Sequence, residues 1–529
     1  MTQGIIAAGN EKTAAAGAEI LRDGGNAVDA AVAAAFTSFI AEPTLVSPGG
    51  GGFGLVFIHD GGQARLYDFF VNAPGLGLTP ETKPDPADFY SITIDYGPAT
   101  QSFHVGRASV ATPGLIAGLC KMQTELGRLP LPVVLQPAIH AARYGLPLGQ
   151  FGAVTGELLR DIFSADPHLA QLMGAPAHFL HPDHRYKNEA LADTLEALGR
   201  EGPDLFYKGA IARAIVQDQQ KHRGLLTAQD LASYQVIVRK PLHQRYRQYE
   251  FFTNPPPSRG GALIAFSLAL LQNYPLARMT FGESQQLALL AEVMRQTNLA
   301  RPFFDASGDV QAFLSSEHLQ KHAAQLAQRL SANPKNHPYD APAPFEHNNT
   351  SHISVLDANG NQVALTTTAG ETPGFIVPGT GLILNNILGE ADLHPEGFLM
   401  GTPGQRIGSM MAPTLVLHDG EPVLAVGSGG ANRIRSAILQ VLLNYLDFGM
   451  PLQAAVDAPR IHFEENAVQM ETGYAAGAVE KMRQWGYDVT VWPTPHMFFG
   501  GAHSVGRTTS GAFEGAGDFR RAGAVVQVA

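Results

Sequence analysis

A polar, proline-rich segment that ends at a β-hairpin constrains this sequence more than any other feature. Ser331–Asn349 contains four prolines and four asparagines in nineteen residues and reads as an exposed linker. Directly after it, Thr350–Leu356 and Gln362–Thr368 have the residue pattern of two strands, separated by the turn sequence Asp357–Asn361. The linker therefore divides the chain into a long part of 349 residues and a short part of 180 that begins with a strand.

The loop of this hairpin decides which residues face one another. A three-residue loop, Ala358–Gly360, with a left-handed Gly360 places Thr350 opposite Thr368. A two-residue Asn-Gly turn shifts the register by one and places Thr368 opposite Ser351 instead. The sequence leaves both registers open.

The first hundred residues alternate between helical and extended patterns. Asn10–Asp23 predicts an amphipathic helix, and Asn26 is a good N-cap for a second helix, Ala27–Ile40. This second helix is so rich in alanine that we expect it to lie buried against a sheet. Four glycines, Gly49–Gly52, then precede the predicted strand Phe53–Ile58, and we expect them to form a tight strand entry with positive φ. Strands before and after a mostly helical middle, 115–330, predict an α+β fold with sheets stacked inside helices.

Composition excludes several classes of protein. The net charge is −11, whereas a nucleic-acid-binding surface needs a basic footprint. The longest apolar stretch, Gly260–Leu271, is too short to cross a bilayer. Cys120 is the only cysteine, so no intrachain disulfide can form, and the 19 histidines follow no metal-ligand spacing. We expect no metal, no cofactor, no nucleic acid and no membrane partner. The N-terminus lacks a secretory pattern, so we expect a cytoplasmic protein.

Thr350 is the candidate nucleophile. If the peptide bond between Asn349 and Thr350 broke, the new α-amine of Thr350 could activate its own hydroxyl as a base. In the first register, Thr368 could then hold the amine or the hydroxyl in place. The alternative is that both residues are ordinary strand threonines, which are common.

A second glycine-rich turn is a candidate oxyanion site. Gly427–Gly430 follows a predicted strand and precedes a predicted helix. Backbone N–H groups in such a turn can point at a developing negative charge, and Gly429 and Gly430 are the candidate donors. An ordinary turn fits the same pattern.

At these residues the sequence resembles the γ-glutamyltranspeptidase (glutathione hydrolase) family of N-terminal-nucleophile hydrolases. Gly24–Ala31 is similar to the family's GGNAVDAA signature, and Thr350–Val355 is similar to its TTHxSV motif. The resemblance covers nearly the whole chain, because further blocks follow in the family's order: Gly49–Phe53, Thr112–Gly114, Leu226–Tyr234, Pro255–Gly261, Leu384–Asn386, Met411–Thr414 and Ala458–Arg460.

The resemblance implies a four-layer αββα fold that is made as a single precursor. It implies cleavage between Asn349 and Thr350 into segments 1–349 and 350–529, which stay interlocked as a heterodimer, with further assembly left open. Thr350 would be the nucleophile, Thr368 the family's second threonine, and Gly429 with Gly430 the oxyanion donors. The partners implied are a small amide substrate such as glutathione and a water or amine acceptor.

The residue with which the family binds the substrate α-carboxylate is replaced in this sequence. The family has an arginine in its DFRE segment, and here Phe70 stands in that place. A phenyl ring cannot replace a bidentate arginine–carboxylate pair. Arg406, Arg433 and Arg435 lie in segments from which a substitute cation could come, although each is more typical of a structural arginine.

Further departures fall in the same pocket. The positions at which we expect substrate contacts are Phe70, Gly370 in place of an asparagine, Ile387 in place of a glutamine, Glu390 as the acidic partner of the α-ammonium, and Ser409-Met410 in place of paired serines. By this resemblance the catalytic residues are retained, whereas most of the residues that bind the α-carboxylate and α-ammonium of the substrate are replaced.

Three readings of function follow. The first is an autoprocessing amidohydrolase that cleaves γ-glutamyl amides, with hydrolysis favoured over transfer because the short segment between Glu390 and Ser409 leaves no long lid. The second keeps the fold and the nucleophile but takes another small acyl group, for which Phe70, Ile387 and Met410 would form an apolar pocket. The third is an unprocessed binding protein without enzymatic activity.

Overall fold

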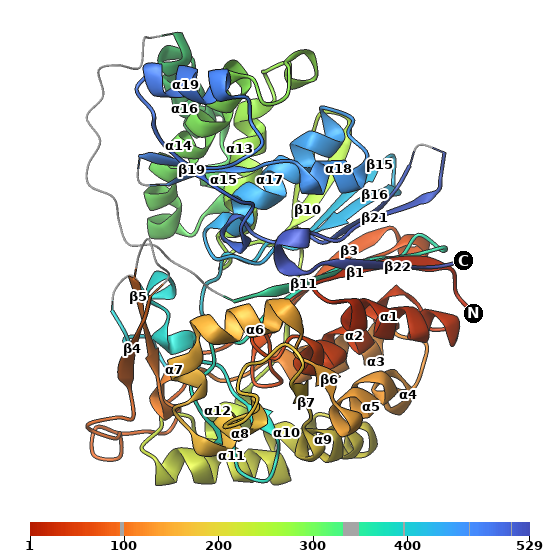
Figure 1. The fold of residues 1–529 in the computed structure, drawn as a ribbon, viewed down its shortest axis with the longest axis vertical. Helices are drawn as coiled ribbons and strands as arrows, with labels where there is room; N and C mark the ends of the chain where they lie inside the picture. Colours follow the sequence, from red (N-terminus) through yellow and green to blue (C-terminus); the bar gives the residue numbers. More distant parts are fainter. Residues whose placement is uncertain (96–99, 332–348, 395–396, 465, 509) are drawn as a thin grey trace.

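Two stacked β-sheets between two layers of helices form this chain, as a computed structural model shows (Figure 1). The structure describes residues 1–95, 100–331, 349–394, 397–464, 466–508 and 510–529. Most of the predicted linker, residues 332–348, lies outside the described residues.

The first sheet has seven antiparallel strands and contains both sides of the Asn349–Thr350 junction. In spatial order its strands are β22 (Ala524–Val528), β1 (Gly4–Ala8), β11 (Ser351–Asp357), β12 (Gln362–Thr368), β2 (Gly51–Ile58), β3 (Gln63–Asp68) and β8 (Ile237–Arg239). Strands from before and after the junction are hydrogen-bonded to one another, so a cut there would leave two fragments in one sheet.

The second sheet has six strands and faces the first. Its strands are, in spatial order, β21 (Phe513–Ala516), β20 (Ser504–Arg507), β16 (Glu421–Val426), β15 (Thr414–His418), β10 (Tyr249–Thr253) and β9 (Leu242–Tyr246). Smaller sheets are formed by β17 (Ile461–Glu464), β18 (Ala467–Glu471) and β19 (Asp488–Trp492), by β4 (Tyr90–Asp95) and β5 (Thr100–Val105), by β6 (Leu146–Pro147) and β7 (Arg185–Tyr186), and by β13 (Ile376–Val377) and β14 (Leu382–Ile383).

Alternation along β1 produces the four layers. Ile6 and Ala8 join the apolar core beneath the helices of the first layer, whereas Ile5 and Ala7 join the core shared with the second sheet. Because successive side chains point to opposite faces, a strand that is apolar throughout must be covered on both sides. The α+β class and the αββα layering expected from the sequence are confirmed.

Helices cover the outer face of each sheet (Figure 1). On the first sheet lie α1 (Glu11–Arg22), α2 (Ala27–Ala41), α3 (Leu115–Leu126), α4 (Leu131–Val134), α5 (Gln136–Tyr144), α6 (Gly149–Leu158), α7 (Arg160–Phe163), α8 (Pro167–Leu172), α9 (Glu189–Glu201), α10 (Asp204–Tyr207), α11 (Ala210–Lys221) and α12 (Ala228–Ser233). On the second lie α13 (Gly260–Leu271), α14 (Ser284–Ser307), α15 (Val310–Phe313), α16 (Ser316–Ser331), α17 (Arg433–Leu446), α18 (Leu452–Asp457) and α19 (Ala476–Gln484).

The predicted N-cap at Asn26 is present, and Asn10 caps the preceding helix. The side chain of Asn10 accepts from the backbone of α1, and Asn26 forms a capping box with Asp29 at the start of α2. Every residue of α2 is buried, as its alanine content predicted. Small side chains allow this helix to lie close to the first sheet.

The expectation of positive φ at Gly49–Gly52 is wrong, because none of these glycines has that conformation. They are needed instead for close approach between backbones. A Cβ on Gly50 would lie 2.2 Å from the carbonyl oxygen of Thr368, and one on Gly49 would lie 2.4 Å from the Cα of Leu384. The glycines therefore let β2 enter the sheet directly beside the end of β12.

The three-residue loop of the central hairpin is confirmed. Ser351 pairs with Thr367, and the N–H of Asp357 donates to the carbonyl of Asn361 at 3.1 Å. Gly360 has a φ of 82°, as the left-handed position requires. Thr350, which directly precedes β11, consequently lies opposite Thr368.

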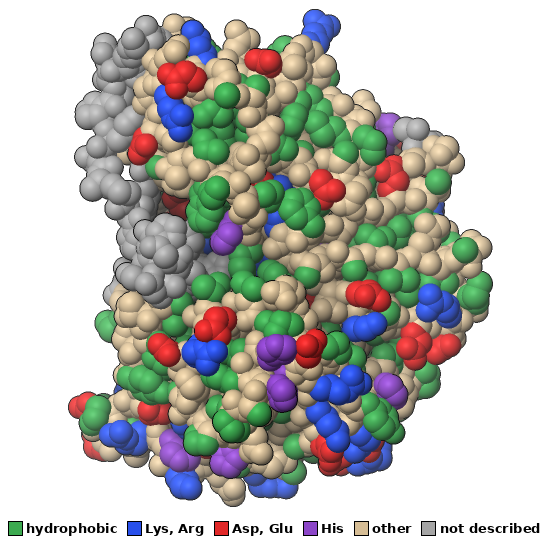
Figure 2. All heavy atoms as spheres, viewed as in Figure 1, with side chains coloured by type: hydrophobic (Ala, Val, Ile, Leu, Met, Phe, Trp, Pro, Cys, Tyr) green, Lys and Arg blue, Asp and Glu red, His purple; other side chains and the backbone are tan. Residues whose placement is uncertain are grey.

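The surface is mixed in charge on the face that Figure 2 shows, where acidic and basic side chains are interspersed. Within the described ranges, we find no helix with the length and apolar character needed to traverse a bilayer.

Candidate active site

A small cavity brings together most of the predicted site residues. Its volume is about 20 Å³, which is room for about one water molecule. Seven of its lining residues are ones that the sequence singled out: Phe70, Thr350, Thr368, Ile387, Glu390, Ser409 and Met410. The sequence analysis did not propose a role in the site for the other lining residues, which are Asp392, Leu393, Met411, Ala431 and Ile434.

Thr368 holds the carbonyl of the Asn349–Thr350 peptide bond. Its hydroxyl donates to the carbonyl oxygen of Asn349 and accepts from the N–H of Gly370 at 3.0 Å. The sequence suggested that Thr368 would hold the amine or hydroxyl of Thr350. In the uncut chain its hydroxyl donates to the carbonyl instead, where a donor stabilises negative charge on the oxygen.

The predicted oxyanion turn lies beside Thr350, between β16 and α17, as the sequence pattern indicated. A Cβ on Gly429 would lie 2.2 Å from the carbonyl oxygen of Thr350, so a glycine is needed there. Gly430 has a φ of 117°, which side chains rarely adopt. Neither glycine lines the cavity, although the next residue, Ala431, does. Their role as oxyanion donors stays a prediction.

A buried arginine that the sequence analysis missed also contacts Thr350. Arg521 is 2% exposed, and its guanidinium donates to the carbonyl oxygens of Thr350 at 3.4 Å and of Met497 at 3.3 Å. Burial, together with the charge of Arg433, lowers its pKa to about 10, so it is positively charged at neutral pH. Arg521 thus places a positive charge beside Thr350, the candidate nucleophile.

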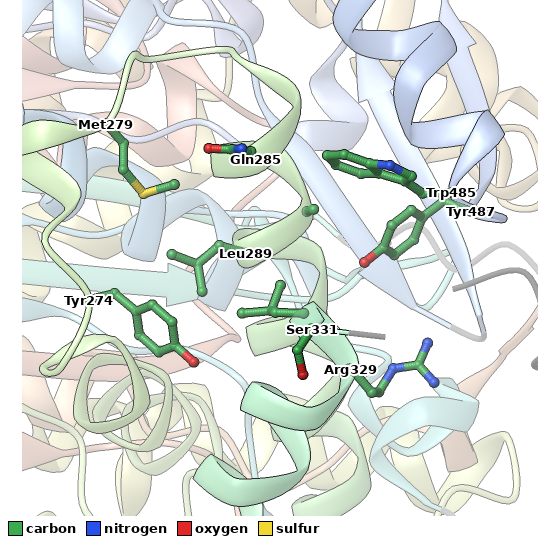
Figure 3. A pocket seen from close by; sticks show the side chains of 10 residues that line it. Tyr274, Met279, Gln285, Leu289, Arg329, Ser331, Trp485 and Tyr487 are labelled. Atoms are coloured by element: carbon green, nitrogen blue, oxygen red, sulfur yellow. The ribbon is translucent and has the colours of Figure 1, made fainter. Parts of the chain in front are cut away.

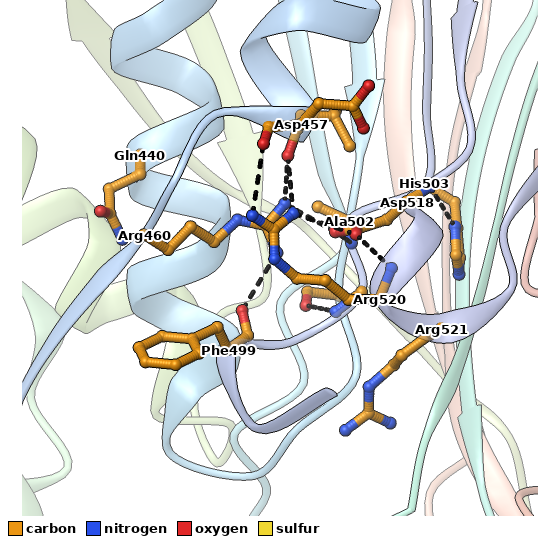
Figure 4. A network of polar contacts seen from close by, with 12 residues as sticks. Gln440, Asp457, Arg460, Phe499, Ala502, His503, Asp518, Arg520 and Arg521 are labelled. Carbon is orange, nitrogen blue, oxygen red and sulfur yellow. Dashed lines mark hydrogen bonds and ion pairs between the residues drawn. The ribbon is translucent and has the colours of Figure 1, made fainter. Parts of the chain in front are cut away.

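A buried network of ion pairs anchors the segment that carries Arg521 (Figure 4). Asp518 is 2.6 Å from Arg460 and 3.2 Å from Arg520, and Arg520 is 2.6 Å from Glu471. Burial opposes ionisation of Asp518, but the charges of Arg460 and Arg520 outweigh it and hold the pKa well below its usual range. The stabilisation from this carboxylate is thus complete above the ordinary aspartate pKa and is lost as the pH falls from there through the lowered pKa of the folded protein.

Removing Asp518 is expected to destabilise the fold strongly. Asp518→Ala leaves two buried arginines without this partner, and breaking a buried pair in this way typically costs about 3–5 kcal/mol. Chemical unfolding at neutral pH measures the difference. Glu157→Ala, which removes the exposed ion pair with Arg160, serves as the control and should cost about 0–1 kcal/mol. Equal stability of the two variants would contradict this interpretation of the network.

Part of the cavity wall is apolar. Phe70 is fully buried and stacks on Phe53 with ring centroids 5.7 Å apart, and Ile387 and Met410 are also buried. Two lining residues, Glu390 and Asp392, are acidic, and none of the described residues that line the cavity is basic.

The three arginines considered as substitutes are engaged elsewhere. Arg406 donates to the Tyr234 hydroxyl at 2.6 Å and lies 3.5 Å from Asp68. Arg435 is 3.5 Å from Glu464, and the guanidinium of Arg433 lies 4.7 Å above the ring of Phe498. These contacts give the three arginines structural roles outside the cavity lining.

Gly370 lies beside the cavity in a conformation that only glycine adopts easily. Its φ is 68°, and a Cβ there would lie 2.1 Å from the side-chain oxygen of Asn386 and 2.3 Å from Glu390. The replacement of the family's asparagine by glycine thus makes room for these two side chains.

A second residue that the sequence analysis missed contacts Ser351, the neighbour of Thr350. Glu42 accepts from the hydroxyls of Ser351 and Thr13, each at 2.6 Å. Burial raises its pKa, although both hydroxyl groups oppose the shift. Glu42 thereby anchors the start of β11 to the end of α2.

Size alone does not identify this site. A cavity of about 530 Å³ lies between α14, α16 and the segment that joins α19 to β19, with Trp485, Tyr487 and Arg329 around it (Figure 3). Arg329 is paired there with Glu292 at 2.7 Å. This larger cavity shares no residue with the one at Thr350 and contains none of the candidate catalytic groups.

Two sheets stacked between helices, with Thr350 directly before a central strand, are the arrangement of an N-terminal-nucleophile amidohydrolase. A family model described as gamma-glutamyltranspeptidase matches residues 13–528, and the chain belongs to this family.

Three relatives show how broad this similarity is. The chain is 32% identical to the acylase ACY 1 proenzyme of Pseudomonas sp. (strain SE83), covering 100% of this chain and 94% of the relative. It is 29% identical to the glutathione hydrolase proenzyme of Escherichia coli (strain K12), over 92% of this chain and 86% of the relative. The crystal structure of cephalosporin acylase from Bacillus halodurans shares the fold, with a TM-score of 0.83 and 24% sequence identity. The match covers 99% of this chain and 96% of that structure.

Proposed function

We propose that this chain cleaves itself between Asn349 and Thr350 and then hydrolyses small amides through an acyl-enzyme on Thr350. The proposal rests on the hydrogen bond from the Thr368 hydroxyl to the carbonyl oxygen of Asn349, because it polarises the carbonyl group that Thr350 would attack. Family membership makes the chain an enzyme and sets aside the reading as an unprocessed binding protein.

The self-cleavage is an acyl shift followed by hydrolysis. The Oγ of Thr350 attacks the carbonyl carbon of Asn349, the C–N bond breaks, and the proton lost from Oγ ends on the nitrogen of Thr350. Water then hydrolyses the resulting ester, which leaves a carboxylate on Asn349 and restores the Thr350 hydroxyl. The freed α-amine can now take the Oγ proton when an amide substrate is attacked.

Cleavage must precede substrate binding. A cavity of about 20 Å³ holds one water but no acyl group. Asn349 is buried next to Thr350 in the chain, and its side-chain amide donates to the carbonyl of Thr44 at 2.9 Å. The departure of Asn349 after the cut would open space beside Thr350.

γ-Glutamyl amides such as glutathione are the first candidate substrates. Glu390 lies in the same cavity as Thr350, where it can receive the α-ammonium of a glutamyl group. The Escherichia coli relative named glutathione hydrolase supports this donor class. Water is the proposed acceptor, because the chain between Glu390 and Ser409 is too short for a long lid.

A small acyl amide without an α-carboxylate is the second candidate. The apolar wall of Phe70, Ile387 and Met410, and the absence of a basic residue among the described lining, favour it. The relative named acylase supports this class.

Turnover of two anilides by the mature protein separates the candidates. A γ-glutamyl anilide and a butyryl anilide release the same chromophore, so their kcat/KM values compare directly. A higher value for the γ-glutamyl compound supports the first candidate, and a higher value for butyryl supports the second. Turnover of neither compound, while Thr350 is free at the N-terminus, would contradict both.

A further inference from the structure

We propose that Glu371 is a positioning residue for the self-cleavage, which it serves by holding the backbone N–H that precedes the scissile carbonyl. The inference rests on the proposed function, since it concerns the same cut between Asn349 and Thr350. Glu371 belongs to neither of the motifs from which the nucleophile was predicted.

Three side chains hold three backbone groups around the scissile bond. A carboxylate oxygen of Glu371 accepts from the N–H of Asn349 at 2.9 Å. Thr368 donates to the carbonyl of Asn349, and Arg521 donates to the carbonyl of Thr350 at 3.4 Å. Because the N–H and the carbonyl of Asn349 lie on either side of its Cα, fixing both fixes the dihedral angles between them. The face of the carbonyl that Thr350 can attack is thereby set.

The turn after β12 brings Glu371 to the junction. Gly370, with its positive φ, reverses the chain two residues after Thr368, and the N–H of Glu371 then donates to the side chain of Asn386 at 2.8 Å. A side chain at position 370 would collide with Asn386 and Glu390. Gly370 and Glu371 therefore work as one unit, with the glycine making the turn and the glutamate holding Asn349.

Glu371 is suited to act as a neutral acceptor. Its side chain is 1% exposed, and its second oxygen is buried with no hydrogen-bond partner among the described residues. Burial raises the pKa of Glu371 well above its ordinary value and Asp392 raises it further, although the hydrogen bond from the Asn349 N–H and the charge of Arg521 oppose the shift. In the protonated acid, one oxygen accepts from Asn349 and the other carries the proton. A glutamine side chain would reproduce this shape and this acceptor.

Two substitutions of similar size test the assignment. Glu371→Gln keeps an acceptor oxygen, whereas Glu371→Met keeps the length of the side chain and removes the acceptor. We expect newly synthesised Glu371→Gln to convert to two chains within about threefold of the wild-type rate. Glu371→Met should convert about 10–100-fold more slowly, since misplacement of a reacting group by about 1 Å costs on that order. Intact-protein mass spectrometry over time gives both rates.

The outcomes separate this inference from the proposed function. A wild-type chain that never converts overturns the proposed function itself. Conversion of wild type together with equally fast Glu371→Met, or with equally slow Glu371→Gln and Glu371→Met, overturns only the role of Glu371. Melting temperatures of both substitutions in a Thr350→Ala background show whether each chain folds. If Glu371→Met unfolds, the test rests on Glu371→Gln alone. Conversion of Glu371→Gln at the wild-type rate supports the neutral acceptor, and conversion slowed more than tenfold overturns it.

Discussion

Replacing Thr350 with alanine is expected to leave one uncut chain of 529 residues without amidase activity. Both reactions need the same hydroxyl, once against the Asn349 carbonyl and later against the substrate. Removal of a hydrolase nucleophile lowers kcat by about 10⁶-fold, so no turnover above background should remain. Gel electrophoresis of the purified protein and an anilide assay measure the two effects.

Thr350→Ser is the matched control for this substitution. It keeps a hydroxyl at the same position, so we expect the chain still to be cut and to retain activity, with rates altered by the lost methyl group. A Thr350→Ala protein that is cut at the same bond would show that another group attacks Asn349 and would contradict the mechanism.

Loss of the Thr368 hydroxyl is expected to have the next largest effect. Thr368→Val preserves the shape of the side chain but removes the donor to the carbonyl oxygen of Asn349. Removing one such donor typically costs about 10²–10³ in rate, so self-cleavage should slow by that factor. The first-order conversion of newly made protein into two chains measures it.

Thr368→Ser restores the hydroxyl and should restore conversion to within about tenfold of wild type. If Thr368→Val converts at the wild-type rate, its hydrogen bond to the carbonyl does not contribute to cleavage.

Local patterns predicted the elements that position the site. The cap at Asn26, the buried alanine-rich helix and the two strands around Gly360 all follow from interactions within a few residues of the chain. The hairpin also predicts a contact between residues far apart in the sequence, because its loop length determines that Thr350 lies opposite Thr368.

Long-range contacts explain what the sequence could not predict. Gly49–Gly52 indicated a special backbone conformation, but Gly49, Gly50 and Gly52 instead allow close approach to backbone more than 300 residues later in the chain, which no local pattern reveals. Arg521 is similar, because it reaches Thr350 only through the order of strands in the first sheet. Its position beside a second arginine near the C-terminus was the only available signal.

The residues around the cavity were predicted only in part. The resemblance placed Phe70, Ile387 and Met410 in one pocket, and the structure brings them to one cavity with Thr350. It did not indicate Glu371, because that residue lies in none of the matched blocks and only the turn at Gly370 directs it back to the junction.

Intact-protein mass spectrometry of the purified wild-type protein tests the central claim most directly. The account predicts two masses that together equal the precursor plus one water, from chains of 349 and 180 residues, with Thr350 at the new N-terminus. A single mass near 56.3 kDa that persists in aged protein, or a new N-terminus at any residue other than Thr350, would contradict it.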